Sequence, residues 1–266
     1  LLKLPHAKTV EPEKLKETIE EAVKNLESVF LIGKVSTLIL EKNVRYKISE
    51  RGLKVRGYIL SMESFKTLYD AIKNSQKEDG IYFFDLFYYL TNTEEIIKDE
   101  VRPEKGAWKE SDDRTNPVVQ FIRHSASWEE RGIISSELKN KITEKIEIGI
   151  LYMGDKLRIW KTIFLILRIE SRNERYVFNE TKMENGIGQR FSESISFLLD
   201  CLNAYVTATK SFEKYCTILG ILSQAVFYGV NPDVLQAEPE LAKDIVANKK
   251  RLQNLSRIYC NNINKR

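Results

Sequence analysis

The chain reads LRIWKTIFLILRIE over residues 157–170, and this stretch decides how its second half is interpreted. Its centre, residues 163–167, is apolar on both faces, which is typical of a strand at the centre of a sheet. Every second residue of 146–152 is apolar or aromatic, which predicts a neighbouring strand, and residues 153–156 predict the turn between the two. A further short strand is predicted at 176–178. The pattern therefore predicts a β-meander.

From residue 187 onward, apolar residues recur with the 3.6-residue period of a helix. Helices are predicted over 187–205 and 211–228, and the second is apolar nearly all round, as expected at the centre of a bundle. A last helix is predicted from Pro239, with an apolar face that should pack on the 211–228 helix. That face consists of Leu241, Ile245, Leu252, Leu255 and Tyr259. The C-terminal part is thus predicted to be a helical bundle, through which the chain could form a homo-oligomer.

The first hundred residues mix two kinds of pattern. Helices are predicted over 11–28 and 62–76, and strands over 30–40 and 44–48. Pro, Gly and polar residues gather in 102–117, which predicts a linker or exposed loop. The expected fold class is α+β, in three parts. These are a mixed helix and β-hairpin module at 1–101, the linker at 102–117, and a β-meander with a C-terminal α-helical bundle at 118–266.

Residues 49–60 admit two interpretations. As a strand, they would complete a hairpin over 44–60, with Lys47 opposite Lys54 and Arg45 opposite Arg56. Like charges directly opposite each other are destabilising unless an anion lies between them, so this register predicts a phosphate-binding face. The acidic 11–28 helix could instead cover and neutralise that face. As a helix, the same residues would begin with Ser49 as the N-cap.

The helical interpretation leads to a family resemblance. Residues 43–54, NVRYKISERGLK, resemble the end of a winged helix-turn-helix DNA-binding domain, where two wing strands lead through a Thr/Ser-acid-x-Gly turn into a last helix. The resemblance covers about residues 14–60. It implies duplex binding, with residues 14–27 as the recognition helix and with Lys34, Lys42 and Arg45 in or near the wing.

Charge is unevenly distributed, although 42 Lys and Arg against 38 Asp and Glu leave a net charge of only +4. Residues 34–56 hold seven cations against two glutamates, and residues 243–266 hold seven cations against one aspartate. Both segments predict contacts with a polyanion. The candidate nucleic-acid-binding residues are Lys34, Lys42, Arg45, Lys47, Arg51, Lys54, Arg56, Lys249, Lys250, Arg251 and Arg257.

Two shorter motifs have both a structural and a functional interpretation. The aromatic run at 82–89 predicts core packing, and alternatively a base-stacking platform or a protein interface. Gly186 and Gly188 stand before a predicted helix, where backbone N–H groups and Arg190 could hold a phosphate. A plain turn is the simpler interpretation of the two glycines.

Signs of catalysis are few, since His6 and His124 are the only histidines and no metal-binding cluster is apparent. No catalytic residue, metal or cofactor is expected. The leading hypothesis is non-enzymatic binding of DNA or RNA. One alternative is an adaptor whose basic segments meet an anionic membrane or an acidic protein. The other is a metal-dependent nuclease that uses Asp113, Glu137 and Lys139.

The cysteines and the longest uncharged stretch bear on the cellular setting. Cys201, Cys216 and Cys260 are widely spaced and odd in number, which favours a reducing compartment, cytoplasmic or nuclear. Residues 215–230 are uncharged and mostly apolar, but as a helix they would span only about 24 Å of a bilayer core about 30 Å thick. We therefore expect a buried helix there and no transmembrane segment.

Overall fold

The structure is a computed structural model, and it describes residues 11–35, 45–58, 60–99, 101–103, 108, 114–170, 173–207 and 212–263. Within these residues the chain forms fourteen α-helices and two small sheets, each of two antiparallel strands. The fold is mostly α-helical, so the predicted α+β class is wrong.

The N-terminal elements mix helices with short strands. They are α1 (Pro12–Ser28), β1 (Ile32–Val35), β2 (Arg45–Ile48), α2 (Glu50–Val55), α3 (Met62–Asn74), β3 (Gln76–Lys77), β4 (Gly80–Ile81), α4 (Phe83–Leu90) and α5 (Glu94–Lys98). The later α-helices are α6 (Pro117–Glu130), α7 (Ser136–Glu147), α8 (Met153–Ile169), α9 (Glu174–Thr181), α10 (Asn185–Thr207), α11 (Cys216–Tyr228), α12 (Pro232–Ala237), α13 (Pro239–Lys243) and α14 (Ile245–Ile263). The predicted helices over 11–28, 62–76, 187–205 and 211–228 are confirmed as α1, α3, α10 and α11.

The predicted β-meander does not exist, because α7, α8 and α9 occupy its residues. The run at 157–170 belongs to α8, in which every residue from Ile159 to Ile169 is buried. A helix buried on all sides loses its 3.6-residue period, and a continuous apolar run then looks the same as a central strand. The stabilisation gained from such packing outweighs local β propensity, so the tertiary environment determines that this segment is a helix.

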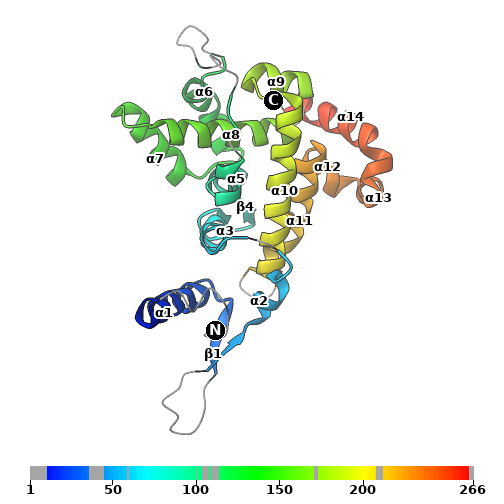
Figure 1. Cartoon of the computed structure of the whole chain (residues 1–266). Helices are drawn as coiled ribbons and strands as arrows, with labels where there is room; N and C mark the ends of the chain where they lie inside the picture. Colours follow the sequence, from blue (N-terminus) through cyan, green and yellow to red (C-terminus); the bar gives the residue numbers. More distant parts are fainter. Residues whose placement is uncertain are drawn as a thin grey trace.

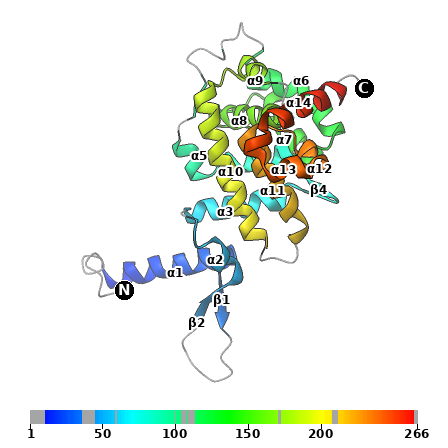
Figure 2. The ribbon, with the colours of Figure 1, turned by 90° about the vertical axis from the view of Figure 1, so that its right-hand side faces the viewer.

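Two long helices, α8 and α10, organise the molecule. α8 packs against α4, α6, α9 and α11, while α10 packs against α2, α3, α5 and α11. Figures 1 and 2 show α10 running lengthwise, with α9 and α14 toward one end and α2, β1 and β2 at the other. Residues 104–107 and 109–113 of the expected linker lie outside the described residues, and the division of the chain there stays a prediction.

Gly188 allows α10 to lie directly against α8. A Cβ at this position would be 2.7 Å from Cζ and 3.0 Å from Cε2 of Phe164, a side chain that is itself buried. Such contacts are too short for real carbon atoms, so the glycine is required by packing. This also explains one of the two glycines in the motif at 186–188 without a phosphate.

We expect Gly188→Ala to destabilise the protein by about 1–2 kcal/mol, because overpacking outweighs the gain in helix propensity. Gly186→Ala is the matched control, since a Cβ there would meet nothing within 4 Å. It should be neutral or stabilising by less than about 1 kcal/mol. Urea unfolding measures the stability of both variants. Equal stability would show that the Phe164 ring moves aside without an energetic cost.

The N-terminal hairpin consists of β1 and β2, and the hairpin predicted over 44–60 is not formed. Ile32 lies opposite Ile48 and Gly33 opposite Lys47, so the predicted register of Lys47 against Lys54 is wrong. Residues 50–55 instead form α2, as the helical interpretation proposed. Ser49 is the N-cap: its Oγ accepts a hydrogen bond from the Gly52 N–H at 3.0 Å.

The aromatic run forms α4 and is part of the core. Phe84, Leu86 and Phe87 are fully buried, and the Phe84 ring lies 5.4 Å from the ring of Trp128 and 5.8 Å from that of Phe121. Core packing is therefore confirmed for this segment. Its buried rings cannot form a base-stacking platform.

Asp85 of α4 is a buried carboxylate that fastens the start of α7. It accepts hydrogen bonds from the Ser135 N–H, at 3.0 Å, and from the Ser135 hydroxyl. The same hydroxyl oxygen caps α7 by accepting from the Leu138 N–H. Burial raises the pKa of Asp85 from 3.8 to about 6, although both Ser135 hydrogen bonds act in the opposite direction.

Because the pKa of Asp85 is higher in the folded than in the unfolded chain, its ionisation weakens the fold as pH rises from about 4 to 6. Asp85→Asn retains an oxygen for the Ser135 N–H and does not titrate. We expect its stability relative to the parent protein to increase across this window by up to about 3 kcal/mol, and to be constant above it. Thermal unfolding at several pH values tests this. A constant difference throughout would contradict it.

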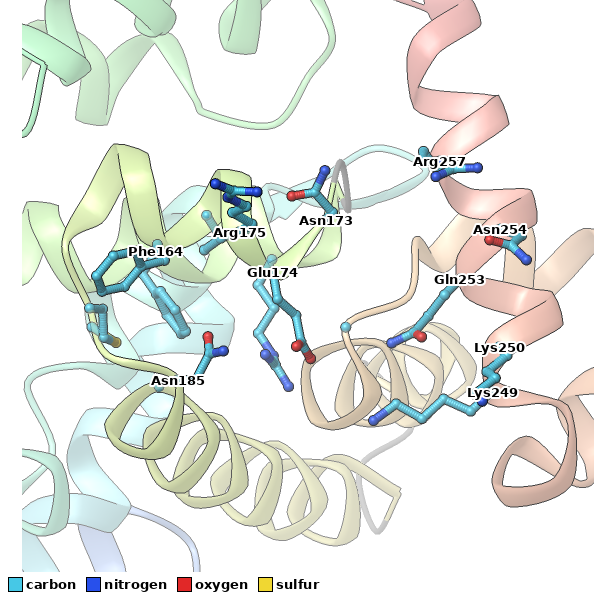
Figure 3. Close-up of a pocket in the computed structure, with 16 residues that line it drawn as sticks. Phe164, Asn173, Glu174, Arg175, Asn185, Lys249, Lys250, Gln253, Asn254 and Arg257 are labelled. Carbon is cyan, nitrogen blue, oxygen red and sulfur yellow. The ribbon is translucent and has the colours of Figure 1, made fainter.

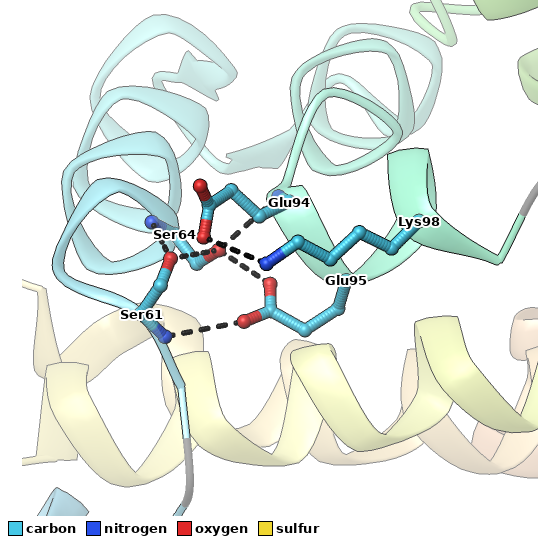
Figure 4. Close-up of polar contacts among 5 residues, drawn as sticks. All are labelled: Ser61, Ser64, Glu94, Glu95 and Lys98. Atoms are coloured by element: carbon cyan, nitrogen blue, oxygen red, sulfur yellow. Dashed lines mark hydrogen bonds and ion pairs between the residues drawn. The ribbon is translucent and has the colours of Figure 1, made fainter.

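A polar cluster holds α5 against the start of α3 (Figure 4). Glu95 accepts hydrogen bonds from the Ser61 N–H, at 3.2 Å, and from the hydroxyl of Ser64. The Ser64 oxygen in turn accepts from the Glu94 N–H at 3.2 Å. Since Ser64 is fully buried, these hydrogen bonds fix where α5 begins.

The single helix predicted from Pro239 is divided at Asp244 into α13 and α14, and α14 packs mainly on α12 and α13 rather than on α11 as predicted. Ile245 and Leu252 of α14 are buried, whereas Tyr259 is partly exposed and donates a hydrogen bond to Asp233. The uncharged stretch at 215–230 contains the buried-core helix α11. No helix in the described part of the chain is both long and apolar enough to cross a bilayer. The three cysteines are thiols, and the expected compartment stays a prediction.

Candidate anion-binding site

The two basic segments lie at opposite ends of α10. Its C-terminal end contacts α2, where Arg51 approaches Tyr205, and its N-terminal end faces α14 (Figure 2). With 23 residues, α10 separates the two ends by about 34 Å. The segments therefore do not merge into one continuous basic patch.

The hairpin and α2 expose three of the candidate residues: Lys47, Lys54 and Arg56. Within the described residues, none of the three forms an ion pair with α1, whose Glu20 pairs with Lys16 instead. The expected alternative, direct neutralisation by Glu17 and Glu20, is therefore not seen there. Lys42 lies outside the described residues, and of Lys34 and Arg45 the structure describes only the backbone, in β1 and β2.

Arg51 is held in place by two aromatic side chains. Its guanidinium carbon lies 4.9 Å from the ring centre of Phe30 and 5.2 Å from that of Tyr205. Its Nη1 donates a hydrogen bond to the Tyr205 hydroxyl at 3.4 Å, and that hydroxyl donates to the Val29 carbonyl. Arg51 thus fastens α2 to α10, and it contributes less to an open basic surface than its neighbours do.

At the other end of α10, a cavity of about 620 Å³ opens between α9 and α14, and we call it the α9–α14 cavity. Among its lining residues, five are cationic and one is a carboxylate, Glu174. The cations are Arg168, Arg175, Lys249, Lys250 and Arg257. Figure 3 shows Lys249 and Gln253 extending from α14 across the cavity toward Glu174. A concave surface lined by one sign of charge concentrates its field, so the cavity is suited to an anion.

Arg168 forms the inner wall of the cavity and is the most constrained of these cations. Its Nε donates to the Val226 carbonyl at 2.9 Å, and its Nη2 donates to Phe227 O at 3.0 Å and to Gln189 Oε1 at 2.8 Å. Gln253 donates to the next carbonyl, that of Tyr228. Together they satisfy the last carbonyls of α11, which a helix leaves without internal partners. Burial lowers the pKa of Arg168, partly offset by Glu174.

We expect Arg168→Met to destabilise the protein by about 3 kcal/mol, since it leaves one buried and two partly buried acceptors without their donor. Arg175→Met, which removes an exposed cation from the same cavity, should cost less than about 0.5 kcal/mol. Chemical unfolding compares the two variants. A small effect of Arg168→Met would mean that water replaces the guanidinium at the end of α11.

The structure divides the basic cluster that the sequence placed in the last helix. Lys249, Lys250 and Arg257 line the cavity, together with Gln253 and Asn254. These positions follow one face of α14 at spacings of one, four, five and eight residues from Lys249. Arg251 lies about 200° around the helix from Lys249 and is exposed away from the cavity.

The contribution of α9 was missed because a strand was expected there. Asn173 caps α9, with its Oδ1 accepting from the Tyr176 N–H, and so places Arg175 and Phe178 beside the cavity. An Asn followed by Glu in the first turn is a sequence signal for a helix start that could have found it. Of the glycine motif, Gly188 lines the cavity, whereas Arg190 is exposed and does not.

Two of the three residues considered for a nuclease, Glu137 and Lys139, lie on α7. Lys139 forms an ion pair with Glu129, and Glu137 is exposed on α7. Asp113 lies outside the described residues. In the part of the chain that the structure describes, no group of three His, Cys, Asp or Glu side chains is placed to hold a metal ion.

Comparisons with protein-family models, curated proteins and solved structures find no match to this chain. The winged-helix resemblance therefore stays a prediction. Its one point of agreement with the structure is that α2 follows the hairpin.

Proposed function

We propose that this chain is a non-enzymatic nucleic-acid-binding protein whose α9–α14 cavity receives backbone phosphates. The observation that carries the proposal is the convergence of Arg175, from α9, with three cations of α14 around a cavity for which the described residues supply one carboxylate, Glu174. Phosphate contacts of this kind supply most of the sequence-independent affinity for nucleic acids.

The cations of α14 are available for such contacts. Within the described residues, Lys249, Lys250 and Arg257 form no ion pair, in contrast to Lys243 of α13, which lies 2.7 Å from Glu240. Arg168 already donates hydrogen bonds to two carbonyls and to Gln189, and it serves as a fixed positive wall. A ligand phosphate would thus meet the α14 cations on one side and this fixed cation on the other.

The size and the polar lining favour a single strand over a duplex. A cavity of about 620 Å³ admits a ligand of nucleotide size, whereas a duplex would have to lie across its mouth. Asn173, Asn185 and Asn254 line the same cavity and offer both donors and acceptors to bases or sugars. Phe178 adds an aromatic ring on which a base could stack.

The hairpin end is proposed as a second, independent contact. Lys47, Lys54 and Arg56 are exposed there, about 34 Å from the cavity along α10. The winged-helix resemblance implies a DNA contact for Lys34, Lys42 and Arg45, which belong to the same basic segment. A polyanion long enough to reach both ends would gain affinity from both. Self-association through the C-terminal helices stays a prediction.

We expect the double variant Lys249→Gln/Arg257→Gln to bind a single-stranded oligonucleotide more weakly. The slope of log affinity against log salt should flatten by about 1.4, since each phosphate contact to a single strand contributes about 0.7. The matched control is Lys243→Gln/Arg251→Gln, which removes the same charges from exposed positions outside the cavity. Fluorescence anisotropy over a range of salt concentrations measures both slopes.

Equal losses in the two double variants would show that net charge, and not the cavity, determines binding. No binding of any oligonucleotide by the parent protein would overturn the proposed function. In that case, binding to vesicles that contain anionic lipid would favour the adaptor alternative. Cleavage of the oligonucleotide with Mg²⁺ would favour the nuclease alternative.

A further inference from the structure

A second cavity, of about 570 Å³, lies at the N-terminal end of α8, and we call it the α5–α8 cavity. Its walls come from α8, from α5 and from the segments before and after α5. It shares no lining residue with the α9–α14 cavity, so it is a separate feature of the molecule.

Lys161 lines this cavity and is 94% removed from solvent, with a relative exposure of 6%. Its Nζ donates to the Ile96 carbonyl at 3.3 Å and lies 5.8 Å from the ring centre of Phe191. No ion pair of Lys161 is found within the described residues. Burial lowers its pKa to about 8, with Asp99 acting in the opposite direction and Arg102 adding to the decrease. An ammonium in this environment is incompletely compensated.

Arg158 stands one turn before Lys161 on the same face of α8. Its Nη2 donates to the Tyr88 carbonyl at 3.0 Å, and its guanidinium carbon lies 3.9 Å from the Tyr88 ring centre. Its Nε is buried and has no hydrogen-bond partner among the described residues. Asp155, a carboxylate in the same wall, is engaged by Lys145 at 3.2 Å. Arg102 also lines the cavity, so three cations surround it, and the donors of Arg158 and Lys161 are only partly used.

The remaining walls are largely apolar, and large apolar side chains are also exposed beside the mouth of the cavity. Val101 and Leu157 line the interior, while Ile97 and Tyr152 are 58% and 75% exposed beside it. Exposed large apolar side chains that adjoin a cavity mark a place where an apolar group binds. The position of Ile97 is fixed, because the Ser61, Ser64 and Glu95 cluster holds α5 in place (Figure 4).

We propose that the α5–α8 cavity binds a small monocarboxylate that carries an apolar tail. The carboxylate lies against Lys161 and Arg158, and the tail lies along Ile97, Leu157 and Tyr152. A singly charged carboxylate fits better than a phosphate dianion, because Asp155 in the same wall repels the second charge. This inference is independent of nucleic-acid binding, since it uses other residues.

The test is isothermal titration of the full chain with octanoate. The parent protein should bind with a Kd below about 1 mM, and Lys161→Met should weaken binding at least tenfold. Methionine keeps most of the volume of the lysine, and only the Ile96 carbonyl loses the hydrogen bond that Lys161 donates. Lys156→Met, on the same helix and outside the cavity lining, is the matched control and should bind as the parent does.

A second variant leaves the buried residues of the cavity unchanged. Ile97→Asp changes an exposed side chain and should weaken octanoate binding at least tenfold, because it removes apolar wall and adds a repelling charge. The ligand controls are acetate, which lacks the tail, and 1-octanol, which lacks the charge, and both should bind at least tenfold more weakly than octanoate.

Octanol binding as tightly as octanoate would overturn the assigned role of the cations. Unchanged binding by Lys161→Met and Ile97→Asp would place the ligand elsewhere, and a Kd above about 1 mM for the parent would overturn the proposal altogether. The double variant Lys249→Gln/Arg257→Gln should bind octanoate normally, which separates this result from the fate of the proposed function.

Discussion

The guanidinium of Arg168, on the inner wall of the α9–α14 cavity, joins three helices. It projects from α8, binds the Gln189 side chain of α10 and satisfies two of the last carbonyls of α11. These helices are distant in sequence, and all of them must be in place before the guanidinium has its partners. Since a buried cation without acceptors is very costly, the interaction selects one arrangement of α8, α10 and α11. The cavity inherits its positive wall from this constraint.

Most of the helices that the sequence predicted have one solvent-exposed face. α3, α10 and α14 each have a buried and an exposed side, and their period is visible without any knowledge of their neighbours. α11 is the exception, since it was predicted although it is apolar nearly all round. α8 is surrounded by α4, α6, α9 and α11, so its sequence carries no period. Its many β-branched residues then indicate a strand. Only the packing of the whole molecule distinguishes the two cases.

The candidate site was predictable in composition and not in geometry. Clustered cations at 249–257 are evident from the sequence, but their orientation depends on the phase of α14 relative to α9. In the orientation that α14 adopts, Arg257 lines the cavity and Arg251 does not. Arg175 could not be assigned, because the strand expected at 176–178 hid its helix. Arg51 looked like part of a basic patch until Phe30 and Tyr205 were seen to enclose it.

The contact between Gly188 and Phe164 has an evolutionary consequence. With 2.7 Å between the ring and the place of a Cβ, the two positions share one fixed volume at the crossing of α8 and α10. A side chain gained at 188 overpacks the crossing and a smaller residue at 164 leaves a cavity, so either change alone passes through a destabilised ancestor. Homologues that retain this helix crossing should therefore change at both positions together.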